Sequence, residues 1–327
     1  MTYDKTYDVI VLGGGDNGLL CAAYLAKSGA KTLLLEQKKD WDIAGNLSTG
    51  EFQGPYRFNL LPPHMVTLGE RAPCYQDLAL AQQSLAYITP PVQFAFHHGD
   101  SRALVLHRDP AKSAASIARF CQADAPRFLA LFEEFRQLCE EILIPSLYAV
   151  DGHVGVATQL SATVLGKRLA DLSAKTPTAI VDSYGFESPQ VREAILYLTT
   201  FWGLDPKQAG LGQLAVLWVY SLLNSSLVKS GNLAAAKALN QSFLENGGDC
   251  PVDVRVERIL IENKQAVGVR LDNGREIRAR CRQHAGCRAV PPRSRRHVQS
   301  AGQCGQGMSR LGMAAVIAAE LPFRLQG

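Results

Sequence analysis

Apolar residues change their period along this chain, and the changes divide it into segments. Residues 7–12 form an apolar run rich in β-branched side chains, which is typical of a parallel strand buried on both faces. Residues 19–28 are good helix formers, and Gly29 follows them as a residue that readily takes the left-handed conformation. Residues 31–35 form a second apolar run. The chain is therefore predicted to open with a strand, a helix and a second strand.

Between the first strand and the helix lies a glycine turn with the spacing G-x-G-x-x-G at Gly13, Gly15 and Gly18. Gly13 permits a tight turn, Gly15 lets the backbone approach a diphosphate, and Gly18 allows the helix to pack closely on the strand. The N-terminus of the helix adds N–H groups and a partial positive charge. This context predicts dinucleotide binding, and the alternative is a turn that only packs. The predicted cofactor contacts in the turn are Gly13, Gly14, Gly15, Asp16, Asn17 and Gly18.

Two acidic residues belong to this predicted site. Glu36 stands at the end of the second strand, where its carboxylate can accept hydrogen bonds from ribose hydroxyls and would repel the 2′-phosphate of NADP. Asp16 is less expected, because it places a carboxylate near the predicted diphosphate. We expect its side chain to face solvent or to cap the helix.

The same pattern returns late in the chain. A helix is predicted over residues 233–245, and Asn273-Gly274 between alternating segments indicates a hairpin. The predicted strands are 252–261, 266–271 and 275–280, with an earlier strand hairpin over 52–60 around Gly54-Pro55. No further short β–α repeats follow Glu36, as they would in a classical NAD-binding domain.

These segments together resemble the phytoene desaturase-like flavoproteins, within the wider FAD-dependent amine oxidase superfamily. The resemblance covers nearly all of residues 1–280 and is carried by Tyr7–Leu20, Ala22–Ala26, Leu33–Glu36, Gly54–Phe58, Asp109–Ala125, Gly231–Leu239 and Gly247–Arg280. It implies FAD as the cofactor. It also implies that Glu36 holds the adenosine ribose and that the backbone of Val256 borders the adenine. Gly45 would lie near the flavin, where Ala44 replaces the first glycine of a Gly-Gly pair.

The resemblance further implies an α/β fold with a discontinuous Rossmann-like FAD-binding domain, an inserted and largely helical substrate domain, and the C-terminal part of the family fold missing. The expected divisions are 1–80 and 231–280 for the FAD-binding domain, 81–230 for the substrate domain, and 281–327 for an atypical tail. Without that C-terminal part, we expect the FAD-binding sheet to lack its last strand.

The middle region is mostly helical by its period. Helices are predicted over 114–121 and 127–144, and Pro145 is expected to end the second. Residues 211–228 form an apolar helix candidate, interpreted as a buried core helix. The alternatives are a wall for a lipid-like substrate or a peripheral membrane contact.

No catalytic side chain is assigned from the sequence. His64 is a candidate proton donor beside the flavin, but the preferred interpretation is a histidine that forms hydrogen bonds within its own loop. The pair His97-His98 gives no stronger indication of a catalytic role. No spacing typical of a metal site is found. In the family that the chain resembles, the flavin carries the redox chemistry and the protein supplies an apolar site.

Composition and charge narrow the classes of function. With 47% hydrophobic and 20% charged residues, the chain is neither disordered nor fibrous. The net charge of +4 arises in the segment after residue 280, which holds seven arginines and one acidic residue. The body is mildly acidic and gives no reason to expect nucleic acid as a partner. Without an apolar leader or a long apolar run, we expect a cytoplasmic protein with reduced cysteines, with membrane contact only at the surface.

The tail from Cys281 loses all patterning. Three interpretations remain beside an ordinary divergent extension: a shifted reading frame, which the abrupt change favours, a basic arm for an anionic partner, or a zinc site. The zinc site would need ligands without standard spacing, namely Cys281, His284, Cys287, His297 and Cys304.

The leading hypothesis is an FAD-dependent oxidoreductase that moves a hydride from a small apolar, isoprenoid or polyene-like substrate to the flavin. The second is a non-catalytic flavoprotein remnant that binds only the ADP part of FAD. The third is an NAD-dependent dehydrogenase, which the missing β–α repeats disfavour. The sequence indicates no oligomeric state, electron acceptor or direction of reaction.

Overall fold

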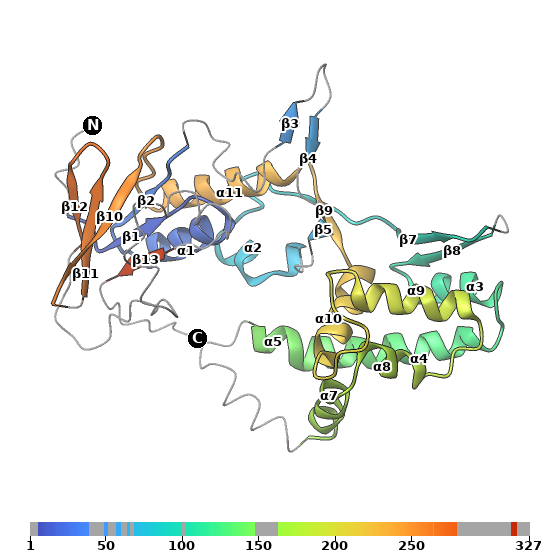
Figure 1. Cartoon of the computed structure of the whole chain (residues 1–327). Helices are drawn as coiled ribbons and strands as arrows, with labels where there is room; N and C mark the ends of the chain where they lie inside the picture. Colours follow the sequence, from blue (N-terminus) through green and yellow to red (C-terminus); the bar gives the residue numbers. More distant parts are fainter. Residues whose placement is uncertain are drawn as a thin grey trace. The chain divides into compact units, whose positions relative to one another are not determined.

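The computed structural model describes residues 6–38, 49–51, 57–59, 64–65, 69–99, 102–147, 163–263, 265–279 and 315–318. The chain forms two compact units, which are considered separately. The first unit comprises 1–63, 70–87 and 228–327, and the second comprises 64–69 and 88–227. The chain first passes between them at residue 64, and passes again at the 3₁₀ turn Gly69–Arg71 (η1), at β6 (Tyr87–Ile88) and at β9 (Ser226–Val228) (Figure 1).

The first unit opens with the predicted strand, helix and strand. β1 (Val9–Leu12) and β2 (Thr32–Leu35) are parallel, with Val9 opposite Thr32, and α1 (Asp16–Lys27) connects them. Every residue of both strands is buried, as an apolar run without alternation predicts. The helix begins at Asp16, three residues earlier than predicted. Gly29 follows it with φ +88°, which confirms the predicted left-handed residue.

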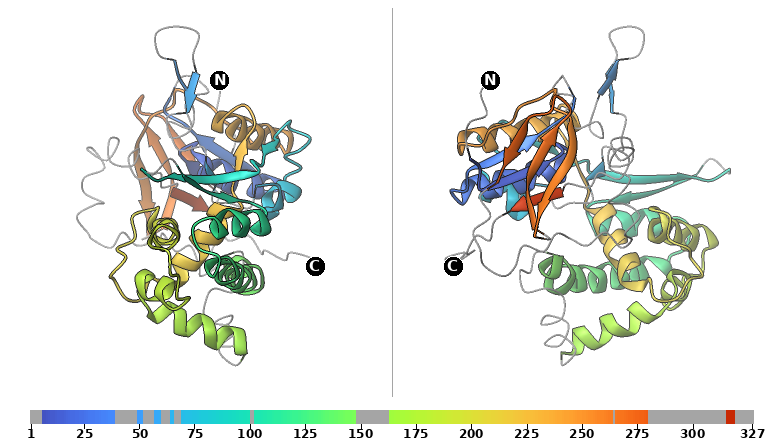
Figure 2. Two further views of the ribbon diagram at one scale, coloured as in Figure 1. Left: turned by 90° about the vertical axis from the view of Figure 1, so that its right-hand side faces the viewer. Right: turned by 60° about the vertical axis from the view of Figure 1, so that its left-hand side comes forward.

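A distant stretch of chain returns to this sheet. α11 (Asn232–Glu245) confirms the predicted helix and lies beside α1 (Figures 1 and 2). Residues 249–254 then run along β2. The N–H of Asp249 donates to the carbonyl oxygen of Thr32 (3.0 Å), and the N–H of Leu34 donates to the carbonyl oxygen of Asp249 (2.8 Å). The 249–254 segment therefore extends the parallel sheet, although the sequence assigned its second half to a strand of the hairpin region.

An antiparallel meander covers the sheet. β10 (Val256–Glu262), β11 (Gln265–Leu271) and β12 (Glu276–Arg278) pair in chain order, and Gly274 at φ +81° makes the predicted hairpin turn. Figure 2 shows the meander (orange) lying across the blue strands β1 and β2. Its apolar face and the sheet share one core cluster: Ile10, Leu12, Leu33, Leu35, Val269, Leu271 and Ile277. The first unit therefore has three layers, in which helices and the meander enclose the sheet.

The tail contributes a short strand to the other edge of the sheet. β13 (Ala315–Ala318) pairs antiparallel with β1, with Ala318 opposite Val9. The sheet does not end at β1, because this short apolar stretch of the tail occupies that edge. The remainder of the tail, residues 281–314 and 319–327, lies outside the described residues, and so do the candidate zinc ligands. The unit also contains α2 (Pro73–Asp77) and the pair β3 (Thr49–Glu51) and β4 (Arg57–Asn59), whose antiparallel pairing confirms the early hairpin.

The second unit is mainly helical, as predicted. Its helices are α3 (Pro110–Ala118), α4 (Asp124–Leu138), α5 (Ile144–Leu147), α7 (Val164–Ala174), α8 (Pro177–Asp182), α9 (Pro189–Thr200) and α10 (Gly212–Leu223). It also holds a two-stranded hairpin that the sequence did not predict, β7 (Val92–His97) with β8 (Ala103–His107). β5 (His64–Met65) pairs with β9.

Three of these helices start with a polar residue followed by proline. The side chains of Asp109, Thr176 and Ser188 accept hydrogen bonds from the first turns of α3, α8 and α9. Proline suits the next position because its missing N–H would have no helical partner there. The helices then bury one core, whose largest fully buried members include Phe128, Leu131, Phe135 and Leu138 of α4, with Leu104, Leu106 and Ile117.

Two helix predictions in this unit were wrong. Pro145 does not end the second helix, because α4 passes through a π-helical turn, Cys139–Leu143, into α5. The π turn changes the hydrogen-bond register just before the proline, and the N–H of Ile144 bonds to the carbonyl oxygen of Cys139. The predicted 211–228 helix stops at Leu223, and its last residues form β9 instead. α10 is a core helix, which agrees with the preferred interpretation.

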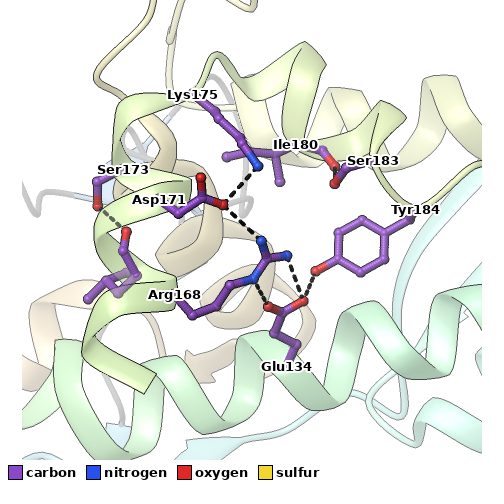
Figure 3. Close-up of polar contacts among 9 residues, drawn as sticks. Glu134, Arg168, Asp171, Ser173, Lys175, Ile180, Ser183 and Tyr184 are labelled. Atoms are coloured by element: carbon purple, nitrogen blue, oxygen red, sulfur yellow. Dashed lines mark hydrogen bonds and ion pairs between the residues drawn. The ribbon is translucent and has the colours of Figure 1, made fainter. Parts of the chain in front are cut away.

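A polar network on the surface of the helical core ties α4 to α7 and to the segment after α8. Glu134 accepts hydrogen bonds from the guanidinium of Arg168 and from the hydroxyl of Tyr184 (Figure 3). Arg168 also pairs with Asp171 (2.9 Å), which Lys175 contacts in turn (2.8 Å). Burial would raise the pKa of Glu134, but the bonds from Arg168 and Tyr184 outweigh it and lower that pKa. The ionised carboxylate therefore holds this network together.

Candidate dinucleotide site

The glycine turn is anchored to the ends of both parallel strands. Gly13 has φ +95°, a conformation that favours glycine, and its N–H donates to the carbonyl oxygen of Leu35 (2.9 Å). The chain is thereby turned sharply out of β1, and α1 begins three residues later. Gly14 is buried beneath the turn, and Gly18 is buried in the first turn of the helix.

The outer side of the turn is open. Apart from each glycine and its chain neighbours, no described atom lies within 4 Å of the place where a Cβ on Gly13 or Gly15 would stand. Gly15 has an ordinary extended backbone (φ −68°, ψ 175°), so it does not need glycine for conformation. What glycine preserves at this position is space beside the backbone, which is what the approach of a diphosphate requires.

The start of α1 has the properties of an anion-binding helix end. Gly15 is the N-cap residue and provides no side-chain hydrogen bond to the first turn. The N–H of Leu19 closes this turn by donating to the carbonyl oxygen of Gly15 (2.9 Å). The N–H groups of Asp16, Asn17 and Gly18 belong to the helix's first turn, where they lack partners within the helix. They are therefore the donors that a phosphate would engage.

The carboxylate of Glu36 is directed at this turn. Glu36 is only 6% exposed, and one carboxylate oxygen accepts a hydrogen bond from the N–H of Gly14 (2.7 Å). The other oxygen accepts from the N–H of Lys38 (3.0 Å). Two backbone donors thus satisfy a buried charge and fix its orientation, while further lone pairs are left to accept from hydroxyls. The sequence placed Glu36 at the strand end but did not reveal these two partners.

Asp16 is the first residue of α1, and its side chain is solvent-exposed. Its side chain accepts no hydrogen bond from a described residue, so of the two expectations for this residue the solvent-facing one agrees with the structure. The surrounding protein atoms nevertheless desolvate the carboxyl group and raise the pKa of Asp16 to about 6. The turn therefore carries an acid whose charge varies near neutral pH.

The segment 249–254 reaches the end of β2, where Glu36 stands. The N–H of Val254 donates to the carbonyl oxygen of Glu36 (2.9 Å), and the N–H of Asp253 donates to that of Lys38 (3.0 Å). Val256, predicted to border the adenine, is half-buried at the start of β10 and follows this contact by two residues. The structure therefore brings the turn, Glu36 and the segment before Val256 together. Gly45, predicted to lie near the flavin, is outside the described residues.

The three histidines considered in the sequence belong to the second unit. The side chain of His64 lies outside the described residues. His97 and His98 belong to the β7–β8 hairpin of the second unit, where the ring of His98 contacts Phe120 at 5.4 Å between centroids. Within the described part of the chain, no three His, Cys, Asp or Glu side chains are grouped as metal ligands would be.

One family model and several known proteins are similar to this chain. A family model described as an NAD(P)-binding Rossmann-like domain matches residues 11–79. One of the limonene dehydrogenase subunits of Castellaniella defragrans is 37% identical over 270 residues, which are 82% of this chain and 48% of that protein. These matches support the resemblance of the chain to the phytoene desaturase-like FAD-dependent oxidoreductases.

Two further matches are more distant. Prolycopene isomerase of Daucus carota is 23% identical over 296 residues, which are 84% of this chain and 45% of that protein. A structure of a redesigned putrescine oxidase has a TM-score of 0.51 at 14% identity, covers 84% of this chain and 56% of that one, and shows the likeness of fold alone. The chain spans about half the length of the curated relatives it matches.

The site fits FAD, the cofactor of the family that the chain resembles. The open side of Gly15 and the uncapped start of α1 suit the diphosphate, and Glu36 suits the adenosine ribose. These features all concern the ADP part of the dinucleotide. Among the described residues, no helix is long and apolar enough to cross a membrane.

Proposed function

We propose that this chain binds FAD at the glycine turn and supports the oxidation of a small apolar, isoprenoid or polyene-like substrate. The observation that carries the proposal is the convergence of Gly15, Glu36 and the segment before Val256 on one strand end. The names of two relatives refer to hydrocarbons of this kind, limonene and prolycopene. Contact with a membrane at the protein's surface would suit such a substrate and is part of the proposal.

The residues of the first unit have defined tasks in this proposal. The first-turn N–H groups of α1 bind the diphosphate, and Gly15 leaves room for it. Glu36, held by the N–H of Gly14, orients the ribose by accepting hydrogen bonds from its hydroxyls. FAD held by these residues would supply the redox chemistry as the acceptor of a hydride from a substrate C–H, and a second hydrogen would leave as a proton. No side chain of the described residues is assigned to that proton.

The absorbance spectrum of the purified chain, before and after incubation with FAD, tests the proposal. We expect a flavin spectrum that stays with the protein through gel filtration and shifts from that of free FAD. Loss of all flavin on gel filtration, together with no quenching of FAD fluorescence on titration, would contradict it. Oxidation is then tested by bleaching of the bound flavin when limonene or a linear polyene is added without oxygen.

A second candidate is a protein that binds only the ADP part of FAD and performs no redox step. It is favoured by one observation: every site residue that the structure describes belongs to the ADP half of the predicted contacts. Competition separates the two candidates. If ADP binds as tightly as FAD and the bound flavin keeps the spectrum of the free cofactor, the non-catalytic candidate holds. Enhanced NADH fluorescence without FAD retention would instead support an NAD-dependent dehydrogenase.

A further inference from the structure

The first residue of α1 sets a negative charge where the proposed function requires a diphosphate. Asp16 directly follows Gly15, whose side of the turn is open, and it belongs to the turn whose N–H groups would bind phosphate. In dinucleotide-binding turns these N–H groups and the helix dipole attract anions. A carboxylate on the same turn opposes that attraction by repulsion between like charges.

Within the part of the chain that the structure describes, no cation compensates this carboxylate. Asp16 forms no hydrogen bond or ion pair with any described residue. The strands β1 and β2 contain no ionisable residue, and Lys27 lies at the opposite end of α1. The remaining ionisable side chains on α1 and on the elements that pack against this part of the unit are Cys21, Tyr24, Glu36, Lys38, Lys237, Glu245, Asp249, Cys250 and Asp253.

We propose that Asp16 is an affinity-setting residue of the site, whose ionised carboxylate weakens the binding of the FAD diphosphate and whose protonation strengthens it. This inference rests on the proposed function, because it requires a diphosphate at the turn. It assigns Asp16 a specific task, which is to make retention of the cofactor depend on pH.

The direction of the pH dependence follows from linkage. Desolvation already raises the pKa of Asp16 to about 6 in the free protein, and a bound diphosphate raises it further. Affinity for FAD is therefore constant below that pKa. Above it, affinity falls by about tenfold per pH unit until the pKa of the complex is reached. The diphosphate diester of FAD keeps its own charge through this range, so the change belongs to the protein.

The experiment measures the dissociation constant of FAD by fluorescence quenching from pH 5.5 to 8.5, for the unaltered chain and for Asp16→Asn. Adenosine, which lacks phosphate, is the second probe. The matched control is Asp272→Asn, which removes one negative charge from an exposed position on the β11–β12 hairpin of the same unit. Thermal melting of each variant at each pH checks that the fold is kept.

We expect Asp16→Asn to bind FAD about tenfold or more tightly than the unaltered chain at pH 8, equally at pH 5.5, and without pH dependence. Asp272→Asn should follow the unaltered chain, and adenosine should bind alike in all three. Equal FAD affinities at pH 8, or tightening that also occurs with adenosine, would overturn the inference while leaving the site intact. Absence of FAD binding in every variant would instead reject the proposed function.

Discussion

The N–H of Val254 donates a hydrogen bond to the carbonyl oxygen of Glu36, across 2.9 Å. This bond joins the end of the second strand to a segment that arrives only after the whole helical unit has been traversed. The side chain of the same Glu36 accepts from Gly14 in the turn. One residue therefore links the phosphate-binding turn to the later half of the site, and both halves must fold for either to be complete.

The space beside Gly15 can be tested with one methyl group. Gly15→Ala should leave the fold unchanged, because the backbone is extended and no atom lies within 4 Å of the added Cβ. FAD affinity should fall roughly 10- to 100-fold, since hydrogen bonds to a charged group contribute about 1.5–3 kcal/mol each. Fluorescence titration measures the affinity and thermal melting checks the fold.

The matched control is Gly99→Ala in the second unit, where a Cβ also meets nothing within 4 Å. It should change neither the affinity nor the melting temperature. If Gly15→Ala bound FAD as well as the unaltered chain, the diphosphate would not lie at this turn.

A second prediction concerns the negative charge of Glu36, which can be removed by substitution. Glu36→Gln keeps an oxygen that can accept from the N–H of Gly14, but it presents an amide group to Lys38 or to the ribose. We expect affinity for FAD and for adenosine to fall about tenfold, equivalent to about 1.4 kcal/mol. Glu257→Gln, an exposed glutamate on β10, serves as the control and should bind both ligands normally.

Calorimetric titration with both ligands separates a ribose contact from a phosphate contact. A variant that lost FAD affinity but bound adenosine normally would place the effect of Glu36 at the diphosphate instead of the ribose.

The network around Glu134 predicts a change in stability. Tyr184→Phe removes one donor to Glu134 (Figure 3) and keeps the ring, which contacts Phe135 edge-on. The second unit should lose about 1 kcal/mol of unfolding free energy. Urea unfolding followed by the fluorescence of Trp202 and Trp218, both in this unit, measures the loss.

Tyr197→Phe is the control for this prediction. The ring of Tyr197 has edge-on contacts to Phe96 and Phe201, and its side chain is half exposed. Its unfolding midpoint should match that of the unaltered chain. Equal midpoints for Tyr184→Phe as well would mean that Glu134 and Arg168 hold the helices without the tyrosine.

A close contact between α10 and α7 predicts a larger loss of stability than the loss expected for Tyr184→Phe. A Cβ at Gly212 would stand 1.8 Å from the carbonyl oxygen of Leu172, so α10 and α7 would have to separate. Gly212→Ala should destabilise the second unit by about 1–3 kcal/mol. FAD affinity, a property of the first unit, should change little where the protein remains folded. A normal urea midpoint for this variant would disprove the tight contact.

Local sequence signals predicted the elements of the site. The apolar runs, the glycine spacing and the acid after the second strand determine β1, the turn, α1, β2 and the place of Glu36, because each depends on neighbours within a few residues. α11 and the turn at Gly274 were predicted for the same reason. The cap-and-proline pairs such as Ser188-Pro189 also mark helix starts, and they were a signal that could have improved the helix boundaries.

Tertiary structure decided what lies beside these elements. The pairing of residues 249–254 with β2 and of β13 with β1 joins segments far apart in the chain, and backbone hydrogen bonding between strands carries no local signature of its partner. The helix continues past Pro145 because a π turn forms within a packed helix. The hydrogen bond from the N–H of Gly14 to the carboxylate of Glu36 forms only when the turn folds against the strand. By itself the sequence determined which groups could bind a dinucleotide, and only long-range pairing of the backbone brought them to one strand end.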